Sequence, residues 1–153
     1  MNNMKIKFKR FHEDAVFPER ATEYAGGWDV VATNIAKAEG SDFAVCNLGF
    51  GLEIPQGYRL TLVPRSSLTK TDWVLQNSPG LGDSDFTGEY KFKFRCIPSE
   101  VIGDKLYYQN FPYKEGDRIG QVYLEQIIPM EFEEVEELSK TERGEGGYGS
   151  TGK

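Results

Sequence analysis

Residues 143–153 are rich in glycine and carry side chains that suit a phosphate group. The stretch holds one guanidinium, Arg143, one aromatic ring, Tyr148, and the hydroxyl groups of Ser150 and Thr151. Glycines let backbone N–H groups approach phosphate oxygens, and the planar guanidinium of arginine matches phosphate geometry. Tyr148 lies between glycines and can stack on a base. The stretch therefore predicts a segment that closes over a phosphorylated ligand, and a plain flexible chain end is the alternative.

Residues 77–88 form a second stretch with chemistry, because turn-forming residues there surround two carboxylates, an amide and an aromatic ring. A hairpin at this place would present backbone groups near Gly80 beside the Asn77 amide, and such groups can read a base edge. Asp83 can orient and deprotonate a water molecule for attack on a bound ester. Asp and Ser are also ordinary turn formers, so a purely structural turn is the alternative.

Three shorter segments carry groups that suit an anion or a metal ion. A helical turn at Ser66 would bring its hydroxyl and Arg65 together on an anion, and the alternative is an N-cap serine beside a surface arginine. Residues 116–121 read as a turn that enters a strand, with an Asp–Arg contact nearby and Gln121 as a polar strand residue. Asp29 stands at the start of a strand, where it faces Mg²⁺ or caps a turn.

The composition fits a single domain of 153 residues, which is long enough to bury a core without disulfides or metals. The formal net charge of −6 argues against broad electrostatic attraction to nucleic acid. Cys46, Cys96 and His12 lack ligand spacing, so we expect no Cys/His metal site. Residues 1–14 lack a signal-peptide core, and no stretch approaches the roughly 18 apolar residues of a membrane span. We therefore expect a cytoplasmic protein, in the host cytoplasm if a phage encodes it, without nucleic-acid or membrane partners.

Short alternating segments between turn residues predict many short strands, and therefore an all-β sandwich or jelly roll. A single helical turn is expected at residues 66–70, and residues 131–138 fit either a helix or an acidic strand. After residue 139 the chain turns polar and glycine-rich, so we expect a β domain over residues 1–140 and a mobile arm over residues 141–153. The expected strands are residues 5–11, 28–33, 42–48, 58–63, 90–97 and 119–128.

The order and spacing of these segments resemble the trimeric deoxyuridine triphosphate nucleotidohydrolase (dUTPase) family, which carries five motifs in this order. The resemblance runs from about residue 25 to the C-terminus, and its third and fifth motifs are specific. The matching segments are Gly26-Gly27-Trp28-Asp29-Val30, Pro64-Arg65-Ser66-Ser67-Leu68, residues 77–88, Gly116-Asp117-Arg118-Ile119-Gly120-Gln121 and residues 143–152.

The resemblance implies a distorted, jelly-roll-like β fold with a flexible C-terminal arm, assembled as a homotrimer with three shared active sites. Motif three of one chain would meet motifs one, two and four of a second chain, and the arm of the third chain would close the site. The implied activity is hydrolysis of dUTP to dUMP and pyrophosphate with Mg²⁺. Such an activity limits uracil incorporation into DNA and supplies dUMP for thymidylate synthesis.

The resemblance also implies roles for individual residues. Asp83 would orient the attacking water at the α-phosphorus, and Asp29 would reach the metal through water in its outer shell. Tyr148 would stack over uracil, and Phe86 would lie against the deoxyribose and exclude a ribose 2′-OH. The remaining implied substrate-binding residues are Arg65, Ser66, Ser67, Asn77, Gly80, Gln121, Arg143, Gly149, Ser150 and Thr151.

Specificity would come from Asn77 and the backbone near Gly80, which would read O4, N3–H and O2 of uracil and leave no room for a thymine methyl group. The sequence departs from the family pattern at Gly82, because this position is usually bulky and apolar. It departs again at residues 96–115, a tyrosine-containing stretch that is longer than in compact relatives and predicts an extra hairpin or loop.

Two alternatives share the fold. A dCTP deaminase, or a bifunctional deaminase-dUTPase, needs a carboxylate, usually glutamate, to activate water at C4 of the base, and residues 83–88 contain no glutamate. The other alternative is a regulatory binding module in which nucleotide-dependent closure of the arm engages a protein partner. Residues 96–115 are the candidate surface for that partner.

Overall fold

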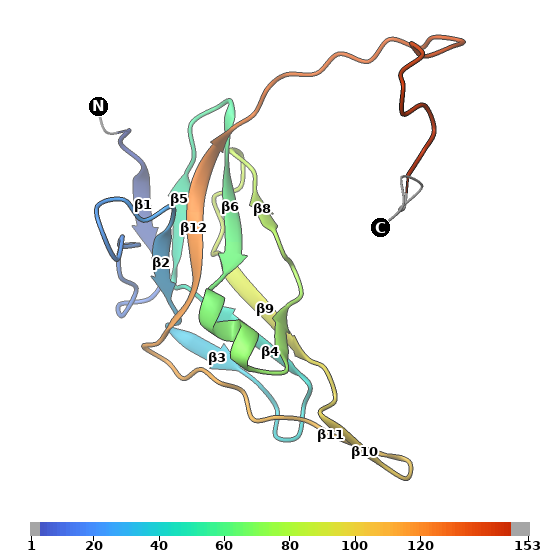
Figure 1. Cartoon of the computed structure of the whole chain (residues 1–153). Coiled ribbons are helices and arrows are strands. Elements are labelled where there is room, and N and C mark those ends of the chain that lie inside the picture. Colours follow the sequence, from blue (N-terminus) through green and yellow to red (C-terminus); the bar gives the residue numbers. More distant parts are fainter. Residues whose placement is uncertain (1–3, 148–153) are drawn as a thin grey trace.

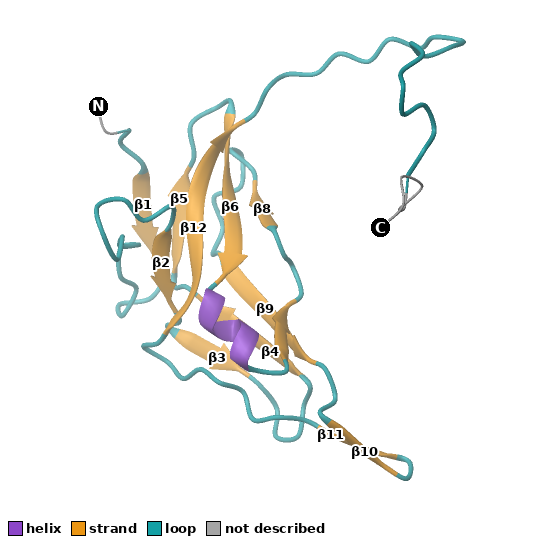
Figure 2. Cartoon of the chain, in the orientation of Figure 1, coloured by secondary structure: helices purple, strands orange, loops and turns teal. Residues whose placement is uncertain are grey.

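The fold is built from short β-strands, and the computed structural model describes residues 4–147 (Figures 1 and 2). Two four-stranded sheets, ordered β2-β12-β6-β8 and β3-β4-β9-β7, form its body, while β1 pairs with β5 and β10 with β11. The elements in chain order are β1 (Lys7–Arg10), β2 (Trp28–Val31), β3 (Asn34–Ala36), β4 (Phe43–Asn47), β5 (Phe50–Glu53), β6 (Tyr58–Pro64), η1 (Ser66–Lys70), β7 (Trp73–Leu75), β8 (Gly80–Gly82), β9 (Lys91–Cys96), β10 (Glu100–Ile102), β11 (Lys105–Tyr107) and β12 (Arg118–Gln126).

Alternation of polar and apolar residues explains how the strands bury a common core. β9 reads Lys-Phe-Lys-Phe-Arg-Cys, and it buries Phe92, Phe94 and Cys96 while the basic side chains face solvent. Trp73 of the neighbouring β7 is buried, and its indole N–H donates to the Gln109 carbonyl oxygen at 3.0 Å. One apolar cluster contains buried residues of both sheets. The sheets therefore enclose a single core.

The predicted all-β class is confirmed, and so are the six predicted strands, which correspond to β1, β2, β4, β6, β9 and β12 with small shifts of their ends. The helical turn at residues 66–70 is confirmed as the 3₁₀ helix η1. Arg65 stands at its N-cap with extended backbone and without a side-chain cap hydrogen bond, so the alternative of an N-cap serine is wrong. Among residues 4–147, no helix has the length and apolar character needed to cross a bilayer.

The hairpin predicted within residues 77–88 is wrong. β7 and β8 are edge strands of different sheets, so residues 76–79 cross from one sheet to the other. β8 pairs with β6, and residues 83–90 return the chain to β9, in the sheet that contains β7. The segment therefore spans the edge of the sandwich, where side chains from both sheets can meet.

The extra stretch at residues 96–115 contains the hairpin β10–β11, which projects from the body of the molecule in Figure 1. After the hairpin the chain returns to the core. The Phe111 ring packs edge-on against Trp73, with ring centroids 4.8 Å apart, and Tyr113 packs on Phe94 at 5.7 Å. One part of the insertion is an exposed hairpin, and the other part completes the core.

Residues 131–138 are neither helix nor strand in the structure. Phe132, Val135 and Leu138 are exposed, because nothing within the described residues 4–147 covers them. A short amphipathic helix is stable only when its apolar face packs on something. Figure 1 shows the chain leaving the end of β12 and running away from the sheets.

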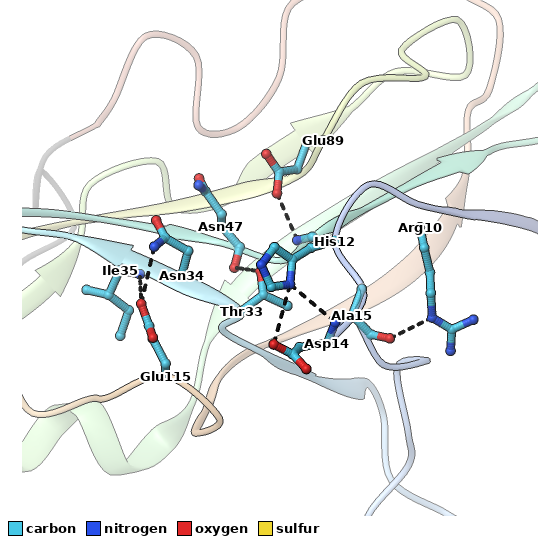
Figure 3. A network of polar contacts seen from close by, with 11 residues as sticks. Arg10, His12, Asp14, Ala15, Thr33, Asn34, Ile35, Asn47, Glu89 and Glu115 are labelled. Atoms are coloured by element: carbon cyan, nitrogen blue, oxygen red, sulfur yellow. Dashed lines mark hydrogen bonds and ion pairs between the residues drawn. The ribbon is translucent and has the colours of Figure 1, made fainter.

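A polar network fastens the N-terminal segment and the start of β9 to the turn between β4 and β5 (Figure 3). The Glu89 carboxylate accepts a hydrogen bond from the Gly49 N–H at 2.9 Å. The Gly49 carbonyl oxygen accepts hydrogen bonds from the N–H groups of Phe11 and His12 at 2.7 and 3.1 Å. These contacts fix the residues that immediately precede β9.

Candidate active site

One cavity of the subunit lies where the chain crosses between the two sheets. It has a volume of about 260 Å³. Its lining brings together Asn77, Gly80, Asp83 and Phe86. From the sequence, Asn77 and Gly80 were expected to read the base, Phe86 to contact the sugar and Asp83 to orient the attacking water. Tyr90, which the sequence analysis did not assign, completes this wall. The fold thus brings the chemistry-bearing residues of the third motif into one hollow.

β8 determines where Asp83 lies. Gly82 is paired with Leu60 of β6, and Asp83 follows directly after the strand ends. The Phe86 N–H donates to the Asp83 carbonyl oxygen at 3.1 Å and closes a tight turn. The Asp83 side chain is exposed, and the Phe86 ring is partly exposed beside it. A solvated carboxylate next to a flat apolar ring suits a group that activates water near a sugar.

The amide of Asn77 is oriented by the neighbouring sheet. Its Oδ1 accepts a hydrogen bond from the Lys93 N–H of β9 at 3.2 Å. The amide nitrogen is thereby turned toward Gly80, where it lies 3.1 Å from the position that a Cβ atom would take. The amide N–H groups of Asn77, which lie beside Gly80, are therefore the donors that Asn77 can offer to a ligand in the cavity.

Tyr90 lies beneath the Asp83 turn and is 3% exposed. Its hydroxyl is buried and has no hydrogen-bond partner among the described residues. Burial, together with the negative charge of Asp83, raises the pKa of Tyr90 to about 12. The phenol is therefore neutral near pH 7.

A second cluster forms around the central strand β12. β12 pairs with β2 on one side and with β6 on the other, so Gln121 stands opposite both Asp29 and Val63. β6 ends at Pro64, opposite Gly120, and Arg65 follows immediately. The register across three strands therefore gathers residues of motifs one, two and four at one level of the sheet.

Asp29 is the centre of this cluster and is only 5% exposed. Its carboxylate accepts hydrogen bonds from Gln121 Nε2 and Arg118 Nη1, each at 3.2 Å, and Arg65 Nε lies 3.5 Å from it. Two guanidinium groups surround one carboxylate, so the cluster carries a net positive charge. Their remaining N–H groups suit the oxygens of a phosphate chain.

An open hollow of about 480 Å³ adjoins this cluster and is lined in part by Arg65, Arg118 and Tyr113. The exposed side chains of Ser66 and Ser67 begin η1, directly after Arg65. Hydroxyl donors beside two guanidinium groups form a surface that favours an extended anion over a single small ion.

The metal prediction rests on Asp29. Among residues 4–147 there is no group of three or more His, Cys, Asp or Glu side chains that could hold a metal ion. Both carboxylate oxygens of Asp29 already accept hydrogen bonds. Mg²⁺ commonly keeps several waters and takes its other ligands from one or two carboxylates and from substrate phosphates. The donor set fits a metal that arrives on a triphosphate and reaches Asp29 through water.

The two clusters are separated within one chain. Gly82 is paired with Leu60 on β6, whereas Arg65 lies just beyond the other end of the same strand. Five residues of extended strand span about 16 Å at about 3.3 Å per residue. Arg143 lies in the exposed segment that follows β12, and Tyr148, Gly149, Ser150 and Thr151 lie outside the described residues. One chain alone therefore does not join the third motif to the guanidinium cluster.

Two residues of the site were missed by sequence reasoning. An Asp–Arg contact was expected near residues 116–121, but Arg118 was not named as a site residue. Asp117 accepts the Lys114 N–H at 2.8 Å, and Arg118 pairs with Asp29 of β2. Only the register of β12 could have revealed this pairing. Tyr90 was expected only as a strand residue. The glycine at position 82 was the one sequence signal, because a missing side chain there indicates that a bulky neighbour fills the space beside it.

The sequence was compared with known proteins. The dUTPase family model matches residues 13–152. The deoxyuridine 5′-triphosphate nucleotidohydrolase of Nautilia profundicola is 35% identical over 151 residues, which cover 98% of this chain and 100% of that protein. The protein of the same name from Helicobacter pylori strain P12 is 35% identical over 150 residues, which cover 97% of each chain.

Solved structures give the same result for the fold. A variant of the Staphylococcus bacteriophage 80alpha dUTPase with dUpNHpp has a TM-score of 0.79 at 25% identity, covering 98% of this chain and 99% of that chain. The dUTPase from phage phi11 of S. aureus has a TM-score of 0.70 at 21% identity, covering 90% of this chain and 100% of that chain. The jelly-roll-like β fold is thus confirmed. Because the family model and the relatives at 35% identity span nearly the whole sequence, this chain belongs to the dUTPase family.

Proposed function

We propose that this chain hydrolyses dUTP to dUMP and pyrophosphate, as a homotrimer with shared active sites and with Mg²⁺ as the metal. The cavity that joins Asn77, Asp83 and Phe86 is the observation that carries the proposal. Membership of the dUTPase family supports it and is consistent with a divalent metal cofactor.

Recognition of uracil follows from the orientation of the Asn77 amide. Its carbonyl oxygen is engaged by the Lys93 N–H, so the amide offers N–H donors to the cavity. Uracil has a carbonyl acceptor at C4, and cytosine has an amino donor there. A donor facing a donor leaves both groups unpaired, and sites of this kind reject the wrong base strongly. The flat Phe86 ring lines the same cavity and is the surface for the deoxyribose.

The guanidinium cluster is the proposed site of the phosphate chain. Arg65 and Gln121, helped by Arg118, contact phosphate oxygens, and the hydroxyl groups of Ser66 and Ser67 add donors. The arm closes the site from another subunit. In the proposal Arg143 binds the terminal phosphate, Tyr148 stacks on uracil, and further phosphate contacts come from Gly149, Ser150 and Thr151.

Asp83 is the proposed general base. Its carboxylate accepts a proton from a water molecule, the water oxygen attacks the α-phosphorus, and the bond from that phosphorus to the bridging oxygen breaks. Pyrophosphate leaves, and dUMP keeps the new oxygen. Asp29 would hold Mg²⁺ through water, and the metal would supply neutralisation of the charge on the phosphate oxygens. The protein's own contribution is positioning and electrostatic stabilisation.

Assembly as a homotrimer is proposed because the single subunit does not complete the site. The third-motif cavity and the guanidinium cluster lie at different levels of β6, with Leu60 beside the first and Arg65 at the second. Residues 127–138 also expose several large apolar side chains, which a soluble chain normally covers. Contact with neighbouring subunits would join the clusters and cover these side chains.

The deaminase alternative has no support in the cavity. Glu89, just outside residues 83–88, does line the cavity. Its carboxylate, however, accepts the Gly49 N–H at 2.9 Å and so anchors the turn between β4 and β5 (Figure 3). A carboxylate used in this way is not positioned to activate water at C4 of a base. Measurement of ammonia release from dCTP tests this conclusion.

The proposal is tested by pyrophosphate release from dUTP with Mg²⁺, in parallel with dCTP, dTTP and UTP. Asp83→Asn should lower hydrolysis of dUTP by about 10²- to 10⁴-fold while the chain still binds dUpNHpp, because a general base is lost and the binding groups remain. Asp85→Asn removes the same charge two residues away and is the matched control, with turnover expected within a few-fold of wild type. Equal turnover by Asp83→Asn and wild type would exclude Asp83 as the base, and absence of release from dUTP would refute the proposed function.

A further inference from the structure

Gly82, the residue before Asp83, has no room for a side chain. A Cβ atom at this position would lie 2.7 Å from Tyr90 Cε1, 3.1 Å from the Tyr90 hydroxyl oxygen and 3.2 Å from Leu60 Cβ. The space beneath the backbone of residue 82 is therefore filled by the Tyr90 ring. The ring touches the chain directly before the proposed catalytic carboxylate.

The same ring supports the other end of the Asp83 turn. The rings of Phe86 and Tyr90 meet edge-on, with centroids 5.3 Å apart and planes at 73°. The Phe86 N–H is bonded to the Asp83 carbonyl oxygen at 3.1 Å, so both ends of the turn rest on Tyr90. A shift of the ring would move Asp83 and Phe86 together.

Tyr90 is itself held from both sides. Its N–H donates to the Phe50 carbonyl oxygen at 3.1 Å, and its carbonyl oxygen accepts the Leu48 N–H at 3.1 Å. The preceding residue, Glu89, is tied to Gly49 (Figure 3). A buried ring on a backbone with these contacts is a rigid support and not a mobile side chain.

The hydroxyl group of Tyr90 adds no hydrogen bond to the support. It is buried without a partner among the described residues. A buried polar group without a hydrogen bond contributes no favourable interaction and carries a desolvation cost. The closest approach to residue 82 is made by the ring carbon Cε1, and the contact with Phe86 is made by the ring.

We infer that Tyr90 is a positioning residue for Asp83, and that Gly82 and Tyr90 are a complementary pair in which the ring supplies the bulk that residue 82 lacks. The inference rests on the proposed function, because it concerns the placement of the proposed general base. It assigns to Tyr90 an effect on the chemical step that acts through Asp83.

Four variants test this inference by kcat and KM for dUTP and by affinity for dUpNHpp. Tyr90→Leu should lower kcat by about 10- to 100-fold with a much smaller change in affinity, because a displacement of about 1 Å can cost about 10²-fold in rate. Tyr90→Phe keeps the ring and should stay within about two-fold of wild type. Gly82→Ala should lower kcat because its Cβ atom would clash with Tyr90. Gly82→Ala combined with Tyr90→Leu restores about the original side-chain volume and should recover much of the lost kcat.

The outcomes separate this inference from the proposed function. Wild type that does not hydrolyse dUTP removes the proposed function itself. Wild type that is active, with Tyr90→Leu equally active, overturns only the positioning role, and so does a loss of kcat as large in Tyr90→Phe as in Tyr90→Leu. Thermal unfolding identifies a variant that does not fold. If Tyr90→Leu fails to fold, Gly82→Ala decides, because it displaces the ring while keeping it, and unchanged kcat then overturns the inference.

Discussion

Tyr90 is an acidic group whose ionisation is opposed by its place in the fold. Burial and the charge of Asp83 raise its pKa from 10.0 to about 12. The unfolded chain therefore loses this proton at a lower pH than the folded chain does. The stability linked to Tyr90 is fully present below pH 10 and is lost as the pH rises toward 12.

This linkage predicts that Tyr90→Phe resists alkaline unfolding better than wild type. A shift of two pKa units corresponds to at most about 2–3 kcal/mol. The difference in the free energy of unfolding between Tyr90→Phe and wild type should therefore grow toward that size between about pH 10 and 12. The measurement is urea unfolding at a series of alkaline pH values. Tyr24→Phe, at a side chain that is 89% exposed, is the control and should follow wild type. Parallel curves for Tyr90→Phe and wild type would contradict the prediction.

At the scale of single residues, the sequence predicted groups that lie close together in the chain and missed groups that depend on pairing. Asn77, Asp83 and Phe86 fall within one short stretch, so their shared cavity could be anticipated. The partnership of Arg118 with Asp29 joins residues 89 positions apart, and it exists only because β12 pairs with β2 in one register. A residue pattern carries no information about that register.

At the scale of elements, all six predicted strands span four or more residues, whereas the three-residue strands β3, β7 and β8 were missed. β9 and β12 bury every second residue along part of their length, and this period is visible in the sequence. β3, β7 and β8 each span three residues, which is too few to establish a period, and their formation depends on pairing with longer neighbours. Residues 131–138 have helical spacing, but without a packing surface in the chain the spacing produces no helix.

β12 is the element that sets the guanidinium cluster, and one glycine lets it approach the core. A Cβ atom at Gly120 would lie 2.1 Å from Phe92 Cε1, well inside van der Waals contact. Phe92 is fully buried, so it has little space into which to move. The next residue, Gln121, donates to Asp29, and displacement of β12 would disturb that hydrogen bond.

Gly120→Ala should therefore destabilise the fold and weaken the phosphate site together. Overpacking of a core commonly costs about 1–3 kcal/mol, which a urea unfolding curve resolves. Affinity for dUpNHpp should fall in the same variant. Gly26→Ala is the control for stability, because no atom lies within 4 Å of its added Cβ. An unchanged unfolding midpoint for Gly120→Ala would show that Phe92 moves aside without a loss of stability, and would contradict the prediction.

At the scale of the whole molecule, a single chain holds two separated clusters of site residues and an exposed segment after β12. The third-motif cavity and the guanidinium cluster use different parts of β6, and the chain beyond β12 extends away from both (Figure 1). Along that segment Phe132 is 88% exposed and Leu138 is 86% exposed. Both facts favour a site completed by neighbouring copies, and the sequence alone could suggest this assembly only through family resemblance.

A chain that ends at Glu142 tests the role of the arm. Because residues 143–153 follow an exposed segment, their removal should leave the chain trimeric and the melting temperature unchanged, while hydrolysis of dUTP falls steeply. Size-exclusion chromatography with light scattering, thermal unfolding and pyrophosphate release measure the three quantities. Loss of the trimer or full retention of turnover would each contradict an arm that acts only by closing the site.

The sharing of sites can then be tested by mixing the truncated chain with the Asp83→Asn chain and refolding them together. Each parent trimer should be nearly inactive, because one lacks every arm and the other lacks every general base. If Asp83 and the arm reach a site from different chains, half of the sites receive an intact Asp83 and half receive an intact arm. In an equal mixture that assembles at random, about a quarter of the sites should therefore hold both. If both parts came from one chain, no mixed site would hold them together, and the mixture would stay as inactive as its parents. Recovery near a quarter of wild-type turnover therefore requires that the site is built between subunits.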